Sequence, residues 1–478
     1  MEAGGPSRKK RKPAAGVETA DEAPAPAETE APDPGVGEED DGLVDRISSL
    51  PDGVLGDIIS LLPTDEGART QILATKWRHL WLSAPLNLDC THLLHRYRNH
   101  ADRAAGVVSR ILSSHSGPGR RLRVDNLHHF DLGAVDDWLR SGALDNLQEL
   151  ELGCYPTVAL LPPFTFRFAP TLRVATLKMC NLPDGIIQGL HFPLLKQLGL
   201  HYVSISECSL HSLIASCRAL ECLLILHSTG FGCLRINSLT LRSIGVDNNN
   251  SDYRIPVHFK ELIIENAPCL EKLLHLHVGA GLHLSVVSAP QLETIGYLSD
   301  GYYQKVNQDY LCKFEFGSTI IQGLRVDKLA MVRTVKTLAV QLRILSLDTV
   351  IQLMACFPCL EKLYIRTAPK PSNVWRRKHR DLTRCPDIRL KTIVLDSYRG
   401  IKSEVNFVTF FVLNARVLEL VKLGGCSGNK EFLAEQRRKL QLDERASKGA
   451  RIHFTTRSCI RYILDHVRSL DVIDPFLL

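Results

Sequence analysis

The residue types that could carry chemistry are sparse in this sequence and do not gather into a recognisable reaction centre. Cys356 and Cys359 form a single C-x-x-C pair, and no second pair follows at zinc spacing, although a structural zinc needs four ligands. His275 and His277 have no carboxylate or thiol set nearby in the sequence, and no Walker loop, G-x-G-x-x-G or H-E-x-x-H motif is present. We therefore predict no catalytic residue, no metal and no cofactor.

A second kind of candidate is a run of cations near the start of the chain, Arg8, Lys9, Lys10, Arg11 and Lys12, directly before a proline. It lies in a stretch, residues 1–42, that is rich in Ala, Pro, Gly and acids and has almost no large apolar side chain, so we predict a disordered tail. An exposed basic run in such a tail suits a nuclear import signal. The alternative is a solvated run neutralised by the acids that follow.

A further cluster of cations surrounds Trp375. It consists of Arg366, Lys370, Arg376, Arg377, Lys378, Arg380 and Arg384. Clustered cations could hold an inositol phosphate, an acidic substrate or nucleic acid. A solvated loop is the favoured interpretation, because no recognisable nucleic-acid-reading module accompanies the cluster.

The composition indicates the class of protein to which the chain belongs. The 478 residues include 45% hydrophobic and 23% charged side chains, which is ordinary for two to four globular domains. No window approaches the ~18–20 continuous apolar residues of a membrane span, and the N-terminus shows no secretory signal pattern. Fourteen scattered cysteines are typical of reduced core thiols in a cytosolic or nuclear protein. Residues 1–42 have a net charge of −6 and the remainder +12, which is weak support for nucleic-acid binding.

The pattern of residues 43–89 predicts a small, all-helical unit. Its first helix begins near Pro51 and ends at Pro63. The first helix carries two apolar stripes at helical spacing: Leu50, Val54, Ile58 and Leu61, and then Leu55, Ile59 and Leu62. A second helix begins at Thr64 and includes Trp77 and Trp81. A helix with one solvent-exposed face needs only one apolar stripe. The second apolar stripe therefore requires another surface to cover it, which is either the next domain or a different protein.

From about residue 100 to residue 379 a loose repeat of the form L-x-x-L-x-L appears. Its leading leucines 147, 172, 195 and 220 are separated by 25, 23 and 25 residues. That period predicts a leucine-rich-repeat solenoid, in which each copy adds one short strand to a curved parallel sheet with helices or loops outside. The alternative is a set of unrelated buried strands in an α/β domain. The register is uncertain between 230 and 350, where the copies are irregular.

Alternation along these strands selects candidate contact positions. The x positions Glu151, His201, Glu265, Tyr364 and Arg366 should face away from the stack, so our hypothesis is that they form a substrate-binding set. Loops or the C-terminal unit could serve instead. This last unit, residues 380–478, should close the stack, because Leu390 and Leu395 continue the repeat geometry and an open solenoid end needs a cap.

The chain resembles the plant F-box proteins that combine leucine-rich repeats with a C-terminal FBD domain. The F-box match includes Leu50-Pro51-Asp52, Leu61-Leu62-Pro63-Thr64, Ala68-Arg69-Thr70 and Trp77-Arg78-His79-Leu80-Trp81. The FBD match includes Cys385-Pro386, Leu390-Lys391-Thr392-Ile393, Tyr398-Arg399-Gly400 and Leu413-Asn414-Ala415. One departure is Ala74-Thr75, where the family usually has Ser and a basic residue; it is expected to weaken adaptor binding without abolishing it.

The resemblance implies a fold and a function. The fold is an F-box, a repeat solenoid and an FBD cap. The F-box would dock on a Skp-type adaptor that hangs from a cullin scaffold carrying a RING subunit, and the repeats or FBD would present an unknown protein substrate for ubiquitin transfer. The adaptor-binding set, which would divide between the domain's core and the adaptor, is Leu50, Pro51, Leu55, Ile58, Ile59, Leu62 and Pro63.

We therefore expect a non-catalytic recognition subunit of a ubiquitin ligase in the nucleus, the cytoplasm or both, with no membrane and no nucleic-acid partner. One alternative is a leucine-rich scaffold or nucleic-acid-associated protein whose F-box has degenerated. Another is a receptor in which a small ligand bridges the repeat surface and the substrate.

Overall fold

The computed structural model describes residues 46–97, 100–154, 158–248, 258–276, 281–300, 311–328, 330–367, 388–460, 464 and 466–477. The predicted import run at residues 8–12 and the basic cluster at 370–384 lie outside these ranges. The chain forms two units, 1–49 and Leu50–Leu478. In the first unit, residues 46–49 form a turn, and the helices and strands described below belong to the second.

Eleven α-helices occur in the described part of the chain. They are α1 (Asp52–Leu61), α2 (Thr64–Arg69), α3 (Thr75–Ser83), α4 (Cys90–Arg96), α5 (Ala101–Ser114), α6 (Leu132–Arg140), α7 (Asp184–Ile187), α8 (Glu207–Ser216), α9 (Leu347–Cys356), α10 (Lys402–Asn414) and α11 (Lys430–Lys439). Side chains that accept from the first-turn amides cap α4, α6, α8, α9 and α11, whereas α1, α2 and α3 have no such cap. None of the helices in the described ranges is both long and apolar enough to cross a membrane.

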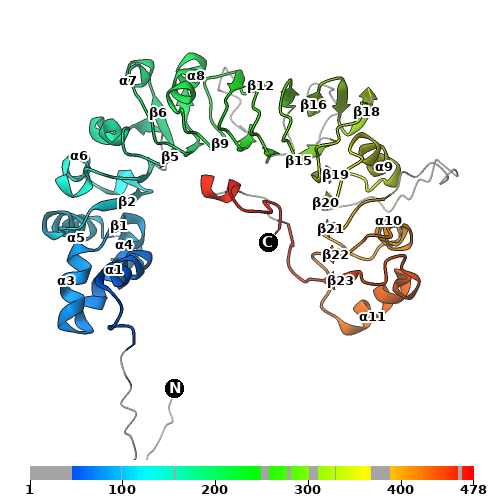
Figure 1. The fold of residues 1–478 in the computed structure, drawn as a ribbon, viewed down its shortest axis with the longest axis horizontal. Helices are drawn as coiled ribbons and strands as arrows, with labels where there is room; N and C mark the ends of the chain where they lie inside the picture. The colour runs from blue at the N-terminus through cyan, green and yellow to red at the C-terminus, as the bar shows by residue number, and fades with distance from the viewer. Residues whose placement is uncertain are drawn as a thin grey trace, which may run out of the picture. The chain divides into compact units, whose positions relative to one another are not determined.

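The main sheet has fourteen strands within the described residues, all parallel to their neighbours. In order they are β1 (Leu86–Asp89), β2 (Gly119–Val124), β3 (Glu149–Gly153), β5 (Val174–Lys178), β7 (Gln197–His201), β9 (Cys222–Leu226), β11 (Ser243–Asp247), β13 (Lys272–His275), β15 (Thr294–Ser299), β19 (Thr337–Leu342), β20 (Lys362–Thr367), β21 (Thr392–Asp396), β22 (Leu420–Leu423) and β23 (Arg451–Phe454). Helices such as α5, α6, α8 and α9 lie on the outer side of this curved sheet (Figure 1). The predicted α/β solenoid is confirmed.

Each repeat strand starts at a fixed distance from a buried anchor. From β3 to β22 the strand begins two residues after a buried leucine or, once, valine: Leu147, Leu172, Leu195, Leu220, Leu241, Leu270, Leu292, Val335, Leu360, Leu390 and Leu418. The backbone N–H of the residue before each strand bonds to the preceding coil, which fixes the register. These anchors therefore supply the register that the sequence left open between 230 and 350.

The irregular copies between 230 and 350 have a structural cause. There the outer side of the solenoid is built from a second sheet instead of helices, made of β10 (Cys233–Asn237), β12 (Glu261–Asn266), β14 (His283–Val286), β16 (Lys313–Phe316), β17 (Thr319–Gln322) and β18 (Arg325–Lys328). The last two are antiparallel to their neighbours and lengthen one repeat. A smaller sheet of β4 (Ala159–Leu160), β6 (Cys180–Leu182) and β8 (Ser204–Ile205) lies earlier in the chain.

The predicted unit boundaries do not coincide with breaks in the structure. Residues 86–89, at the end of the predicted all-helical unit, form β1 and pair with β2, so that unit is not wholly helical. At the other end, β21, β22 and β23 continue the same sheet beyond the repeats, as the leucine pattern indicated. Hydrogen bonding along one continuous sheet therefore joins the three predicted units.

Alternate residues of each strand face two different clusters. In β9, Leu223 and Ile225 belong to the main core beneath the outer elements, whereas Leu224 lies on the opposite, inner face. We call residues 466–477 the strap; it contains the short helix η8 (Val467–Leu470) and contacts this inner face through Val467, Leu470 and Phe476. The strap is the red segment on the inner side of the sheet in Figure 1.

Candidate functional site

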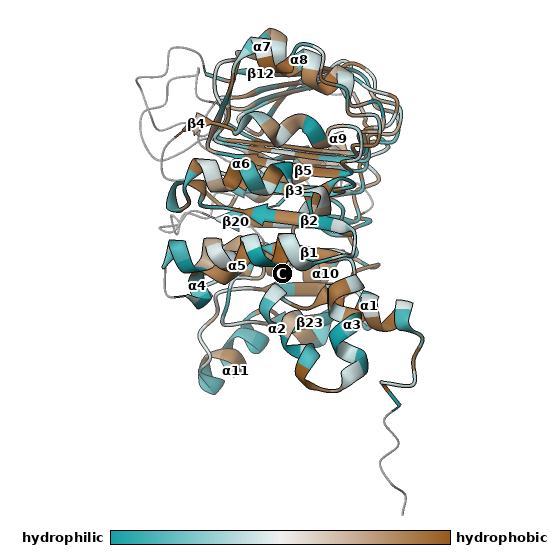
Figure 2. Ribbon diagram, turned by 90° about the vertical axis from the view of Figure 1, so that its left-hand side faces the viewer, coloured by the Kyte–Doolittle hydropathy of each residue, from teal (hydrophilic) through white to brown (hydrophobic). Residues whose placement is uncertain are grey.

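The first candidate surface is the exposed face of α1. Leu55 and Ile59 are buried in the main core, whereas Val54, Ile58 and Leu61 are exposed at spacings of four and three residues. Figure 2 shows apolar residues along α1, which lies at the margin of the unit Leu50–Leu478. Both stripes recognised in the sequence are present, and only one is covered by the chain itself.

The seven predicted adaptor-binding residues are divided by this arrangement. Pro51, Ile58 and Pro63 are exposed, and Leu50 and Leu62 are half-buried. Leu55 and Ile59 pack into the chain's own core, so they lie on the core side of the expected division.

Sequence reasoning left four apolar residues of this region out of the adaptor-binding set. Val54 and Leu61 belong to the stripe that the helical spacing had already identified, and that stripe was the signal that could have included them. Ile72 and Leu73, in the turn before α3, are also exposed. Exposed apolar side chains concentrated in one small region are typical of protein-binding surfaces.

The Ala74 departure has a local structural consequence. Ala74 is the N-cap residue of α3, and no side-chain hydrogen bond caps this helix. A serine at the N-cap would offer a hydroxyl to the free amides of the first turn. The helix still positions Trp77 and Trp81 in the core, so the missing cap weakens the start of α3 without changing the side that it buries.

Thr64 joins the helical region to the sheet. Its buried hydroxyl donates to the carbonyl oxygen of Asn87 at 3.0 Å and accepts from the amide of Asp89 at 3.0 Å. Both groups lie on the free edge of β1, the first strand of the main sheet. Because a sheet edge leaves backbone groups unpaired, this one side chain replaces two ladder hydrogen bonds and fixes α2 to the sheet.

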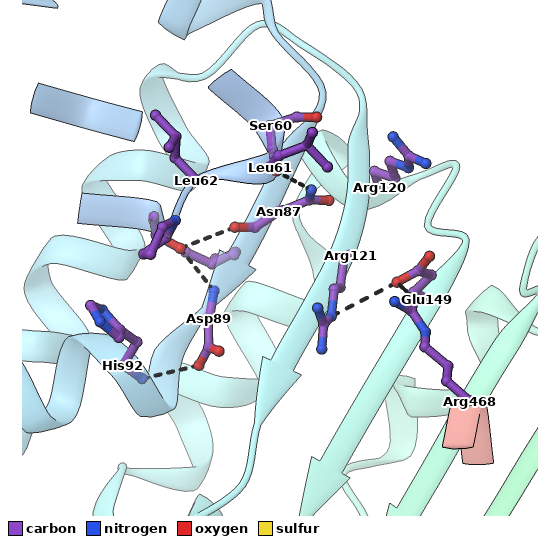
Figure 3. A pocket seen from close by; sticks show the side chains of 13 residues that line it. Ser60, Leu61, Leu62, Asn87, Asp89, His92, Arg120, Arg121, Glu149 and Arg468 are labelled. Carbon is purple, nitrogen blue, oxygen red and sulfur yellow. Dashed lines mark hydrogen bonds and ion pairs between the residues drawn. The ribbon is translucent and has the colours of Figure 1, made fainter. Parts of the chain in front are cut away.

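A pocket of about 340 Å³ lies beside this junction, where the end of α1 meets β1, β2 and β3. Figure 3 shows Arg468 of the strap reaching Glu149, with which it forms an ion pair. Arg121 also approaches Glu149, at 3.8 Å. Glu149 therefore pairs with two of the three arginines that line the pocket.

The inner face of the first repeats carries a buried charge cluster. Lys178 Nζ lies 2.5 Å from Glu151 Oε1 and 3.1 Å from Asp125 Oδ1, and Arg123 pairs with both carboxylates. Burial opposes ionisation of Glu151, but Lys178 outweighs it, so the pKa of this carboxyl is lowered. The pKa of Asp125 is lowered for the same reason. The cluster is mutually neutralised and has the character of a structural ion network.

His201 lies next to this cluster and is held neutral. Burial lowers its pKa to about 3, and the positive charge of Lys178 and the neighbouring His466 act in the same direction, with Glu151 opposing them. His466 belongs to the strap and lies 3.7 Å from Glu151 through its Nε2. Burial also lowers the pKa of His466.

The predicted substrate-binding positions are separated by the structure. Glu151, His201, Tyr364 and Arg366 lie on inner-sheet strands, as their alternation indicated. Three of them, Glu151, His201 and Tyr364, are buried rather than open, and strap residues contact Glu151 and Tyr364. Arg366 is half-buried.

Glu265 is corrected, because it lies on β12 of the outer sheet. It is half-buried there and pairs with Arg235 at 3.0 Å. The alternation argument selected the correct side of its strand but not the correct sheet.

The cysteines and histidines raised by the sequence occupy ordinary positions. Cys356 is buried and Cys359 is half-buried, and the cysteines in the described ranges are free thiols. His275 is buried, and its Nε2 lies 3.3 Å from Asn248 Oδ1. No group of three or more His, Cys, Asp or Glu residues suited to a metal ion occurs in the part of the chain that the structure describes.

Comparison with known proteins places the repeats and the C-terminal segment in described families. A family model for the leucine-rich repeats of the FBD-associated F-box protein At5g56370 matches residues 135–365, and the FBD model matches residues 379–423. The F-box/FBD/LRR-repeat protein At1g13570 of Arabidopsis thaliana is 22% identical over 86% of this chain and 98% of its own length. The chain is therefore similar to the F-box/FBD/LRR-repeat family over its repeats and its C-terminal segment.

Two other members of this family in Arabidopsis thaliana align over shorter regions. The F-box/FBD/LRR-repeat protein At3g52680 is 30% identical over 48% of this chain and 53% of its own length. The putative F-box/FBD/LRR-repeat protein At5g44950 is 28% identical over 42% of this chain and 46% of its own length. The chain thus spans about half the length of these two relatives.

The F-box/FBD/LRR-repeat assignment can be followed along the structure. The repeat model extends from α6 to β20, and the FBD model covers β21, α10 and β22. The strand β23, the helix α11 and the strap follow the FBD match. The predicted resemblance to plant F-box proteins with leucine-rich repeats and an FBD domain is confirmed. The names of these relatives describe interaction modules rather than a reaction.

Proposed function

We propose that this protein is a substrate-recognition subunit of a cullin–RING ubiquitin ligase and docks on a Skp-type adaptor through α1. The observation that carries the proposal is the division of α1 into a buried stripe and an exposed one. Val54, Ile58 and Leu61 remain available although the opposite side of the same helix is sealed by the chain's core.

The energetics of this face suit docking. Full burial of a large apolar side chain contributes about 1.5–3 kcal/mol, and Val54, Ile58 and Leu61 retain much of their surface. Three or four such side chains, with Ile72 or Leu73 included, offset much of an association cost of about 4–15 kcal/mol.

The link between docking and presentation is rigid in this proposal. Thr64 bonds the helices to β1, and the inner sheet continues without a break from β1 to β23. A substrate on this sheet would be held at a set distance from the adaptor and therefore from the charged ubiquitin carrier. The contribution of the chain would be proximity, with the transfer chemistry performed by partner enzymes.

The test is co-purification of the full chain with a Skp-type adaptor and cullin. Ile58→Asp combined with Leu61→Asp should abolish capture, because two charges on the docking face would be desolvated on binding. Leu239→Asp is the matched control, since Leu239 is exposed but lies between β10 and β11. Deletion of residues 43–89 is a poor test, because it removes β1 and exposes the core around Leu55.

Equal capture of both variants and the wild-type chain would contradict the proposal. The alternative, a scaffold or nucleic-acid-associated protein with a degenerate F-box, predicts no adaptor capture and salt-sensitive retention of DNA or RNA. The uncapped α3 at Ala74 is the structural feature that favours this alternative. Residence in the nucleus, the cytoplasm or both remains part of the proposal and can be checked by imaging the chain with and without residues 8–12.

A further inference from the structure

The strap crosses the inner face without joining the sheet. Its helix η8 contacts β7, β9 and β11, and Phe476 contacts Tyr297 of β15 and Tyr364 of β20. The only bridge recorded for the described strap residues joins Leu477 to Ile460, outside the named strands. The strap therefore lies across successive strands and is held by side-chain contacts instead of ladder hydrogen bonds.

Two sockets in the inner face receive large strap side chains. At Gly296 an added Cβ would lie 2.4 Å from the Phe476 ring, and at Gly245 it would lie 3.0 Å from Leu470. A side chain at Gly296 would thus displace the Phe476 ring, and one at Gly245 would press on both Leu470 and Leu224. The ring of Phe476 lies 5.3 Å, centroid to centroid, from the rings of both Tyr297 and Tyr364, which is a favourable separation for aromatic pairs.

Polar side chains beside the sockets bind the Asp474 carboxylate and the main chain of the strap. The Tyr364 hydroxyl donates to Asp474 Oδ2, and Lys362 Nζ lies 3.2 Å from the same oxygen. Lys272 Nζ donates to the carbonyl oxygens of Leu470 at 3.1 Å and Val472 at 2.7 Å. Contacts to main-chain carbonyls do not depend on the residue type, so Lys272 can hold any extended segment that follows this path.

The side of the strap that faces away from the sheet carries exposed apolar side chains. Ile473 is 96% exposed and Val472 is 38% exposed, so these apolar side chains contribute little to the contact with the sheet. Among the anchored groups are the apolar Leu470, the carboxylate of Asp474 and the ring of Phe476. Together they define a pattern that a segment of another protein could carry.

We propose that the inner face around Gly245, Gly296 and Tyr364 is a peptide-binding groove, which the strap occupies as an internal ligand. The partner that fits it is an extended protein segment with an acidic residue two positions before an aromatic residue and a large apolar residue four positions before the acid. Calling this segment a substrate rests on the proposed function, whereas the binding itself does not.

The Gly296 socket, together with Tyr364 and Lys362, explains the preference for an aromatic ring and a carboxylate. The ring buries apolar area between Tyr297 and Tyr364, while the carboxylate supplies the acceptor for Tyr364 and Lys362. A peptide without the acid would leave the largely buried Tyr364 hydroxyl without its acceptor, which is costly. A peptide without the ring would leave the socket above Gly296 unfilled.

The experiment measures binding of a fluorescent peptide that copies residues 466–477 to the full chain. The wild-type chain should bind it weakly, because the tethered strap competes at an effective concentration on the order of millimolar. The variant Asp474→Asn with Phe476→Ala, altered in the strap of the protein only, should bind the peptide at least about tenfold more tightly. Ile473→Ala is the matched strap control and should behave as wild type, since this side chain is exposed.

A third variant tests the groove. Adding Tyr364→Phe to the Asp474→Asn, Phe476→Ala chain should weaken peptide binding by about three- to tenfold, the effect of one lost hydrogen bond. A peptide lacking the acid and the ring should not compete. If the double variant melts without a cooperative transition, Asp474→Asn alone, which preserves side-chain size, is judged by the same criterion.

The proposal is overturned if a folded strap variant binds the peptide no better than wild type, or if Tyr364→Phe has no effect on binding. In that case the strap is a fixed part of the core, and its substitution should lower only the melting temperature. Adaptor capture is measured in parallel on the same variants. Because the strap substitutions leave α1 intact, unimproved peptide binding with retained adaptor capture separates failure of this inference from failure of the proposed function.

Discussion

Leu55 and Ile58 lie three residues apart on α1 yet occupy opposite environments: Leu55 is 0% exposed in the core, and Ile58 is 40% exposed on the outer face of the helix. The relationship separates two roles that the sequence pattern had combined in one set of residues. It also separates two kinds of substitution, because changes at Leu55 act on stability and changes at Ile58 act on a surface.

Leu55→Ala should therefore lower the free energy of unfolding by about 2–5 kcal/mol, since it leaves a cavity in the core. Ile58→Ala should change stability by less than about 1 kcal/mol while weakening adaptor capture. Chemical denaturation with urea measures the first effect, and quantitative pull-down measures the second. A similar loss of stability in both variants would show that the two sides of α1 are not distinct.

Thr64→Val should destabilise the junction between the helices and β1. The substitution keeps the shape of the side chain but removes the hydroxyl that bonds both Asn87 and Asp89, so two backbone groups lose their partner. We expect a loss of about 1–3 kcal/mol, measured as a lower urea midpoint at an unchanged slope. Thr64→Ser retains the hydroxyl and is the control; if Val and Ser behave alike, the hydroxyl bonds contribute nothing.

Ala74→Ser should stabilise the chain by about 0.5–2 kcal/mol, because it supplies the missing cap of α3. The measurement is the thermal unfolding midpoint, with Ala74→Val as a control that adds bulk but no acceptor. If the family's serine acts through the cap, adaptor affinity should rise together with stability. A variant that binds the adaptor more tightly at unchanged stability would instead indicate direct contact by the hydroxyl.

Acid should destabilise the folded chain through His201 before the carboxylates are protonated. The pKa of His201 falls from 6.5 to about 3 on folding, so the unfolded state binds the proton first. Stability is therefore intact above pH 6.5 and is lost progressively as the pH falls toward 3. Burial is the main cause of this lowered pKa; Lys178, His466 and, to a smaller extent, His227 lower it further, and Glu151 opposes them.

Between about pH 6.5 and about pH 4.5 the wild-type chain should lose about 2 kcal/mol more of its unfolding free energy than the His201→Gln chain, because glutamine does not titrate. Denaturation curves at a series of pH values give the slope for each chain. The paired carboxylates Asp125 and Glu151 have lowered pKa values and act in the same direction, but at lower pH. Parallel curves for the two chains over this window would contradict a neutral, buried His201.

The local pattern along the chain determined much of this structure by itself. Leucines 147, 172, 195 and 220 predicted the repeat, and two residues after each of them a strand begins, because an apolar side chain at this position must enter the stack whatever lies outside. The two stripes of α1 were also visible, since helical periodicity is a property of neighbouring residues. The family resemblance added the expected F-box and FBD segments.

Only the tertiary structure decided which stripe of α1 is covered, which sheet holds Glu265 and what lies over the inner face. The contact between Tyr364 and Asp474 joins residues 110 positions apart, and Arg468 reaches Glu149 across 319 positions. Periodicity gives the direction of a side chain relative to its own strand or helix, but it contains no information on which distant segment packs against it. Four of the five substrate-binding candidates lie on inner-sheet strands, as alternation predicted, yet the contacts of the strap with Glu151 and Tyr364 arise from long-range packing alone.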